Sequence, residues 1–199
     1  MADIFSLIYN DVMKVINSWK NDDIYAISFF VYDKDDNPAT PTLTVGYNTM
    51  ERATSKSNRH ASGGEAKWNY AFWLQNQEYL FGYDDETAQL VQNWISSLEL
   101  PNNEGAITEA FVNVLIDISS KLHNDGVIVN TFGKEIPIII HELEYYEAIA
   151  LQNKKANPSG AISEFLQWMD DEVLNPNLYK MDSRAGCLLS LLKRKGASK

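Results

Sequence analysis

The run IYAISFFVY, residues 24–32, most constrains the fold, because it contains no charge and is dominated by β-branched and aromatic side chains. Such a composition predicts a strand that is largely buried. The stretch DKDDNPATPT follows, and its three acidic residues and two prolines predict an exposed turn. The alternating stretch LTVGYNT, residues 43–49, predicts a returning strand. We therefore expect a β-hairpin in the sheet.

A second hairpin is predicted further along the chain, where VIVNTF, GKE and IPIIIHE follow one another with Gly133 in the turn. We expect its strand at residues 136–141 to share one sheet with residues 24–32. Apolar residues at helical spacing predict helices at residues 3–19, 84–100, 103–125, 142–153 and 161–169, and in the C-terminal run AGCLLSLLKRK. The fold class is α+β, with a mainly antiparallel sheet built from two hairpins and covered by several helices.

The middle of the chain is harder to assign. Residues 50–67 contain little apolar material and four basic side chains against two acidic ones, which predicts a mobile, locally basic loop, with a short helix at its start as the alternative to a loop throughout. Residues 68–82 are dense in aromatic side chains, and Trp68 and Phe72 would share one face of a helix.

The length of the chain limits the number of domains, and its net charge limits the classes of partner that it can bind. A chain of 199 residues fits a single domain over residues 1–199, with a flexible basic tail at 193–199. The formal net charge is −10, and residues 1–192 alone carry 13 basic against 27 acidic side chains, a net charge of −14. Such a surface argues against binding of nucleic acid or anionic membrane and favours a basic protein partner. The alternative is that the charge serves solubility alone.

Compartment is predicted from what the sequence lacks. Cys187 is the single cysteine, so no intrachain disulfide can form, and its apolar surroundings predict a buried side chain. Asp3 and Asp11 interrupt the apolar pattern that a signal peptide would need. No apolar run approaches the ~20 residues of a membrane helix. We expect a cytoplasmic protein.

The stretch PIIIHELEYYE, residues 137–147, suggests chemistry at first sight. A zinc protease needs a second histidine four residues after His141, and that position is Tyr145. A carboxylate-rich metal site at His141, Glu144 and Glu147 is the next alternative. We prefer a strand that ends at His141 and a helix whose first turn holds Glu142 and Glu144, where carboxylates meet exposed amide groups. We therefore expect no metal and no cofactor.

Other catalytic patterns are equally weak. The stretch ASGGEAK lacks the spacing of a phosphate-binding loop, and Ser62 beside His60 has no motif around it. A binding protein is therefore favoured over an enzyme. The alternative is a small hydrolase or small-molecule-binding enzyme with a site around His141, Glu142 and Glu144. A third hypothesis is a scaffold that dimerises through residues 68–82.

Three stretches resemble a known family: IYAISFFVYD with YNT, EAKWNYAFW, and IIIHELEYYEAIALQNKKANP. Together they resemble the bacterial family of unknown function numbered four-three-zero-three, over roughly residues 5–160. The resemblance implies an immunity-like protein, which is a small cytoplasmic protein encoded beside a secreted toxin. It carries over no catalytic residue. The recurrent positions would be Asn48, Trp68, Trp73, His141, Glu142, Asn157 and Pro158.

Two acidic clusters are the predicted partner-binding residues. One follows the first strand and the other begins a helix, and all six side chains should be exposed, since carboxylates are almost never fully buried unless paired. They would attract a basic partner, such as a toxin. The residues are Asp33, Asp35, Asp36, Asp84, Asp85 and Glu86.

Overall fold

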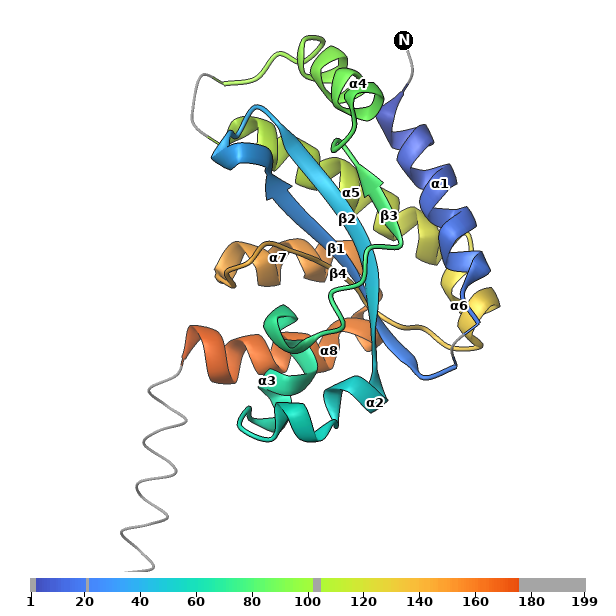
Figure 1. Cartoon of the computed structure of the whole chain (residues 1–199), viewed down its shortest axis with the longest axis vertical. Coiled ribbons are helices and arrows are strands. Elements are labelled where there is room, and N and C mark those ends of the chain that lie inside the picture. Colours follow the sequence, from blue (N-terminus) through green and yellow to red (C-terminus); the bar gives the residue numbers. More distant parts are fainter. Residues whose placement is uncertain (1–2, 21, 102–104, 176–199) are drawn as a thin grey trace, which may run out of the picture.

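The computed structural model of the chain describes residues 3–20, 22–101 and 105–175 (Figure 1). Its strands are β1 (Ile24–Asp33), β2 (Pro41–Thr49), β3 (Tyr79–Phe81) and β4 (Ile138–His141). Its helices are α1 (Ile4–Ser18), α2 (Met50–Ala53), α3 (Gly63–Trp68), α4 (Asp85–Ile95), α5 (Ala106–Asn124), α6 (Val127–Phe132), α7 (Glu147–Ala156) and α8 (Ser159–Trp168). Short 3-10 turns lie at Lys34–Asp36, Lys56–Asn58 and Tyr70–Phe72, and a π-helical turn, Met169–Leu174, extends α8.

The strands form one four-stranded sheet in the order β3-β2-β1-β4. The predicted α+β class is confirmed, and so is the first hairpin, because β1 and β2 pair antiparallel from Ile24 opposite Thr49 to Asp33 opposite Pro41. The predicted sharing of one sheet by residues 24–32 and 136–141 is also confirmed. However, β4 runs parallel to β1, so the sheet is mixed.

The second predicted hairpin is wrong. Residues 127–132 form helix α6 instead of a strand, and it lies between Gly126 and Gly133, whose φ angles are 73° and 69°. Left-handed glycines commonly end helices, so this pair isolates one short helix from its neighbours. Val127 and Ile128 are β-formers, but both are buried in the core, and tertiary packing overrides their local preference.

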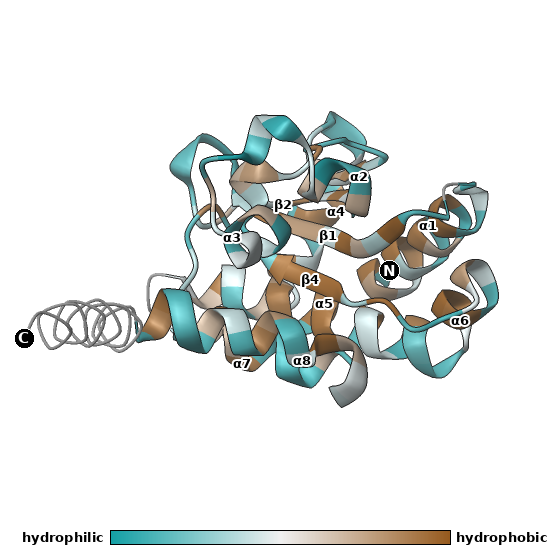
Figure 2. Ribbon diagram, turned by 90° about the horizontal axis from the view of Figure 1, so that it is seen from below, coloured by the Kyte–Doolittle hydropathy of each residue, from teal (hydrophilic) through white to brown (hydrophobic). Residues whose placement is uncertain are grey.

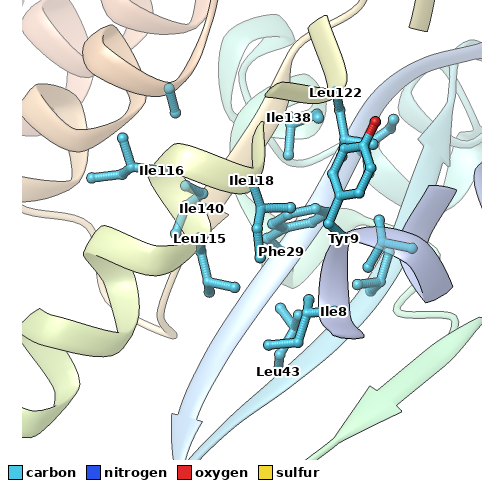
Figure 3. Close-up of a cluster of buried hydrophobic side chains, with 14 of the residues drawn as sticks. Ile8, Tyr9, Phe29, Leu43, Leu115, Ile116, Ile118, Leu122, Ile138 and Ile140 are labelled. Atoms are coloured by element: carbon cyan, nitrogen blue, oxygen red, sulfur yellow. The ribbon is translucent and has the colours of Figure 1, made fainter. Parts of the chain in front are cut away.

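One face of the sheet carries the larger core. Alternate residues of β1, β2 and β4, among them Phe29, Leu43 and Ile140, pack against α1 and α5 (Figure 3). Helices α4 and α6 complete this layer. Helix α1 fits the predicted amphipathic pattern, and the side chain of Asp3 caps it by accepting a hydrogen bond from the Phe5 amide.

The opposite face is built from aromatic side chains. Trp68 and Trp73 pack with Phe165 and Trp168 of the α8 region over Ile139. Because both Trp68 and Trp73 are only 2% exposed, they are not available as a dimerisation surface. Figure 2 shows the apolar ribbon of β4 enclosed between the surrounding helices.

Helix α7 covers the outer edge of β4 with two asparagine side chains. The Asn153 amide accepts from Ile140 N–H and donates to Ile140 C=O, at 2.8 and 2.7 Å. Asn157 does the same to Ile138, with both hydrogen bonds at 2.8 Å. Four residues along a helix rise about 6 Å and two residues of strand about 6.7 Å, so the two spacings match. The asparagines therefore take the place of a neighbouring strand and close the sheet edge.

Residues 50–67 begin with the short helix that was the alternative, but the rest of the segment does not form the predicted mobile loop. They fold into α2, a 3-10 turn and α3, and Ser62 and Glu65 form a capping box at the start of α3. Two of the basic side chains are engaged, since Arg52 donates to the Phe72 carbonyl at 3.0 Å and Lys67 pairs with Glu164 at 2.6 Å. The local basic charge is therefore partly neutralised.

Residues 68–82 do not form the predicted helix either. Helix α3 ends at Trp68, and β3 pairs antiparallel with β2 further on, Leu43 opposite Phe81. Trp68, Tyr70 and Trp73 belong to the aromatic layer, whereas Tyr79 and Phe81 pack in the larger core, so the aromatic side chains do not share one helical face. Helices predicted at 84–100 and 103–125 are confirmed as α4 and α5 within the described residues. The C-terminal helix, Cys187 and the tail at 193–199 lie outside the described residues.

Gly46 of β2 offers a test of how closely the segment after α3 packs on the sheet. A Cβ atom there would lie 2.4 Å from the Asn76 backbone oxygen. Gly46→Ala is therefore expected to lower the free energy of unfolding by about 2 kcal/mol, as overpacking does. Gly63→Ala is the control, because nothing lies within 4 Å and the residue is helical. Urea unfolding that places the two variants at equal stability would contradict this packing.

Candidate functional site

The six predicted partner-binding residues lie at one end of the sheet. Asp35 and Asp36 sit in the turn after β1, and Asp84, Asp85 and Glu86 begin helix α4; these five side chains are exposed. Asp33 differs from the prediction because it is half-buried, and both of its carboxylate oxygens accept from the Thr108 hydroxyl at 3.0 Å. We refer to the five exposed residues as the acidic rim.

Hydrogen bonds join the two segments that carry the acidic rim. The Lys34 ammonium donates to the Tyr83 carbonyl at 3.2 Å, and Gln92 of α4 donates to the Ala39 carbonyl at 2.8 Å. The hydroxyls of Thr44 and Tyr83 are also 3.0 Å apart. The turn after β1 and the start of α4 therefore lie side by side at the upper end of the sheet in Figure 1, and α2 lies at the opposite end.

Some carboxylates of the acidic rim also stabilise the local structure. The Asp84 carboxylate caps α4 by accepting from the amide and the hydroxyl of Thr87, each at 2.8 Å, and these bonds lower its pKa. Asp35 and Asp36 have φ angles of 59° and 55°, a left-handed conformation that aspartate tolerates better than most residues. Asp85 and Glu86 lie in the first helical turn, where the dipole favours acids.

A groove opens beside the acidic rim, between the first half of α5, the loop before α7 and the end of β1. It consists of two adjoining hollows of about 450 and 410 Å³, which share Asp33, Thr108, Glu142 and Tyr146 in their walls. Burial raises the pKa of Asp33, although its hydrogen bonds with Thr108 act in the opposite direction. Carboxylates of Asp36, Glu109 and Glu144 also line this groove.

The groove has an apolar part that the sequence did not predict. Leu143, Leu151 and Tyr146 line it and are 66%, 53% and 44% exposed. Tyr146 donates from its hydroxyl to the Glu142 carboxylate at 2.7 Å, and its pKa is raised by burial and by that carboxylate. The helix predicted at residues 142–153 begins later than predicted, because α7 starts at Glu147. The prediction that Glu142 and Glu144 lie in its first turn is therefore wrong.

His141 lies beneath this region and is fully buried. Its Nδ1 atom donates to the Glu142 backbone carbonyl at 2.9 Å, and its Nε2 atom therefore accepts from the Ser28 hydroxyl at 2.8 Å. Aromatic rings of Phe30, Tyr70, Trp73 and Tyr145 surround the imidazole. Desolvation lowers the pKa of His141 to about 4.

These contacts bear on the alternative of an enzyme site around His141, Glu142 and Glu144. The imidazole bonds a backbone carbonyl and a buried hydroxyl, whereas the Glu142 carboxylate bonds Tyr146 in the groove. Ser28 is 3% exposed, so an external substrate does not reach its hydroxyl in this conformation. The structure therefore does not bring the three residues together around one accessible point. Sequence reasoning missed Ser28, which no motif marks.

Two further properties of the described part of the chain concern metals and membranes. In residues 3–20, 22–101 and 105–175, no three histidine, cysteine or acidic side chains are grouped so that they could hold a metal ion. Over the same residues, every helix is too short or too polar to cross a bilayer.

Compared with known proteins, the chain matches no family model, no curated protein and no solved structure. The resemblance to family four-three-zero-three therefore stays a prediction. Of its recurrent positions, Trp68, Trp73, His141 and Asn157 are buried, and Asn48 donates to the Tyr25 hydroxyl at 2.9 Å. Packing and internal hydrogen bonds account for these side chains without a ligand.

Proposed function

We propose that this protein acts by binding a basic protein partner through its acidic rim, as a non-enzymatic module. The observation that carries the proposal is the meeting of two acidic segments, separated by almost fifty residues in sequence, at one end of the sheet. Opposite charges on two partners accelerate their encounter and favour one orientation over others. The net charge of −10 acts in the same direction.

The specific form of the proposal is an immunity protein of the cytoplasm that neutralises a toxin. Its support is the resemblance to family four-three-zero-three, together with the charge, since toxins that cleave nucleic acid need a basic surface. Co-purification with the products of the genes next to its own is the direct test. If none of those products binds, the immunity form of the proposal is wrong.

Charge removal in the acidic rim tests the binding surface once a basic partner is in hand. Asp35→Asn with Asp36→Asn removes two charges and keeps side chains that tolerate a left-handed backbone. Asp85→Asn with Glu86→Gln removes two more and leaves the Asp84 cap intact. At low salt, each pair should slow association about threefold to tenfold, and the effect should diminish as salt screens the charges.

The matched control is Asp22→Asn with Glu51→Gln, two exposed acids at the opposite end of the β1–β2 hairpin. It removes the same number of negative charges and should leave the association rate almost unchanged. Stopped-flow or surface plasmon resonance measures the rates, and urea unfolding verifies that all variants are folded. Equal slowing by the rim pairs and the control would show that total charge matters and the rim does not.

A further inference from the structure

The groove is longer than its two hollows beside the acidic rim. A third hollow of about 490 Å³ adjoins them, because Leu143 and Glu144 line both it and the hollow at the end of β1. Its far wall contains Glu172 and Val173, close to the end of the described chain at Asn175. We call the three hollows together the long groove.

The walls of the long groove have a definite chemical character. Three exposed apolar side chains, Leu143, Tyr146 and Leu151, lie along it. Apolar patches bordered by charge are typical of surfaces that bind a peptide or protein segment. Lys155 is a basic residue in the wall at one end, whereas acidic side chains occur in all three hollows: Asp33, Asp36, Glu65, Glu109, Glu142, Glu144 and Glu172. The complementary occupant has aliphatic anchors and several basic residues.

The chain itself contains such a segment. Residues 188–195 read LLSLLKRK, four leucines followed directly by Lys193, Arg194 and Lys195. Leu188 follows Asn175 by 13 residues. Thirteen residues of extended chain span at most about 45 Å. Since Val173 already lines the long groove, the segment is tethered at its edge, and a short tether gives a local concentration in the range of ~1 mM.

We propose that residues 188–195 dock in the long groove of the same chain. The leucines would pack on Leu143, Tyr146 and Leu151, and the basic residues would lie against the carboxylates that border them. The inference does not depend on the proposed function, because it concerns the isolated chain, and the acidic rim meets the long groove only at Asp36. An incoming partner would find most of the rim open.

Cys187 makes the docking measurable, because it is the single cysteine and precedes Leu188. A nitroxide attached to Cys187 of the full-length chain broadens the NMR signals of amides near it. We expect the amides of residues 143–151 and of the first half of α5 to lose more than half of their intensity relative to the reduced label. Amides of α6, which contributes no residue to the walls of the long groove, should keep theirs. Uniform broadening, or broadening centred on α6, would overturn the proposal.

Two variants of the labelled chain test the apolar and the charged contacts of the docked segment separately. The quadruple variant Leu188→Ser, Leu189→Ser, Leu191→Ser and Leu192→Ser should restore the signals, and so should Glu142→Gln with Glu144→Gln. The control pair Asp22→Asn with Glu51→Gln should not. Hydrogen exchange of unlabelled full-length protein provides a second readout, since residues 142–151 should exchange faster in the four-serine variant. If residues 142–151 exchange equally fast in both proteins, docking is contradicted. This result does not depend on any effect of the nitroxide on docking.

A mixture distinguishes docking within one chain from docking between copies. Spin-labelled chain without isotope is mixed with isotope-labelled chain that carries no nitroxide. Intramolecular docking predicts full intensity for residues 143–151 of the isotope-labelled chain. Broadening in the mixture would mean that the segment occupies the long groove of a second copy, and the proposal of docking in the same chain would be wrong.

Discussion

Replacing Asn153 by alanine is expected to lower the free energy of unfolding by about 3 kcal/mol, a large share of the stability of a domain of this size. The side chain is fully buried and serves both the N–H and the C=O of Ile140. Alanine would leave the Ile140 N–H without its partner at the closed sheet edge, whereas the Ile140 carbonyl would keep the hydrogen bond that it accepts from Gln152 at 2.8 Å. A buried polar group without a hydrogen bond costs about 1–3 kcal/mol.

Two further substitutions make the Asn153 test specific. Asn153→Asp keeps the shape but cannot donate to the Ile140 carbonyl, so it should destabilise at least as much as alanine. Lys154→Ala alters the next residue of α7, which is exposed, and should change the stability by less than about 0.5 kcal/mol. Urea unfolding followed by tryptophan fluorescence measures all three. If Asn153→Ala and Lys154→Ala are equally stable, the asparagine does not substitute for a strand.

The parts of the fold that could be predicted depend on neighbours in sequence. The hairpin of β1 and β2 follows from one buried run, one turn and one alternating run. Strand β4 was predicted as a strand, but its partner could not be predicted, because the parallel pairing of Ile138 with Ile27 joins residues more than a hundred positions apart. A run of isoleucines could pair with β1 or with the strand that was predicted at residues 127–132. The path of α5 and α6 decides between these two partners.

The closed edge of β4 could not be predicted from the spacing of the two asparagines alone. Asn153 and Asn157 are four residues apart in the printed sequence, and that spacing puts both on one face of α7. On an isolated helix, two asparagines at this spacing predict a face toward solvent. Their burial follows from the position of β4, which presents the unpaired backbone of Ile138 and Ile140 to them.

The candidate site was predicted in part for the same reason. Exposure of five of the six acidic residues follows from their chemistry, but their position side by side depends on Lys34 and Gln92, which no motif marks. The groove was missed because α7 was expected to begin at residue 142. Tyr145 holds the preceding loop in place, since its hydroxyl donates to the Trp68 carbonyl and accepts from the Tyr70 amide. That contact leaves Leu143 and Tyr146 at the surface.

The buried imidazole of His141 should make the protein less stable in acid. In the unfolded chain the ordinary pKa of histidine is 6.5, and desolvation lowers it to about 4 in the folded chain. Between these values the unfolded chain binds a proton that the folded chain does not, so stability falls as pH falls from about 6.5 to about 4. The stabilisation is fully present above pH 6.5, and its loss by pH 4 is about 3 kcal/mol.

His141→Gln isolates this contribution from the many carboxylates that also titrate in acid. Glutamine can accept from the Ser28 hydroxyl but does not take up a proton in this range. The variant should be less stable than the original chain at pH 7.5, and the difference between the two should shrink by about 2.5 kcal/mol at pH 4.5. Urea unfolding at several pH values provides the comparison, because the carboxylates common to both proteins cancel. If the two stability curves run parallel from pH 7.5 to 4.5, His141 takes up no proton on unfolding and is not held neutral by burial.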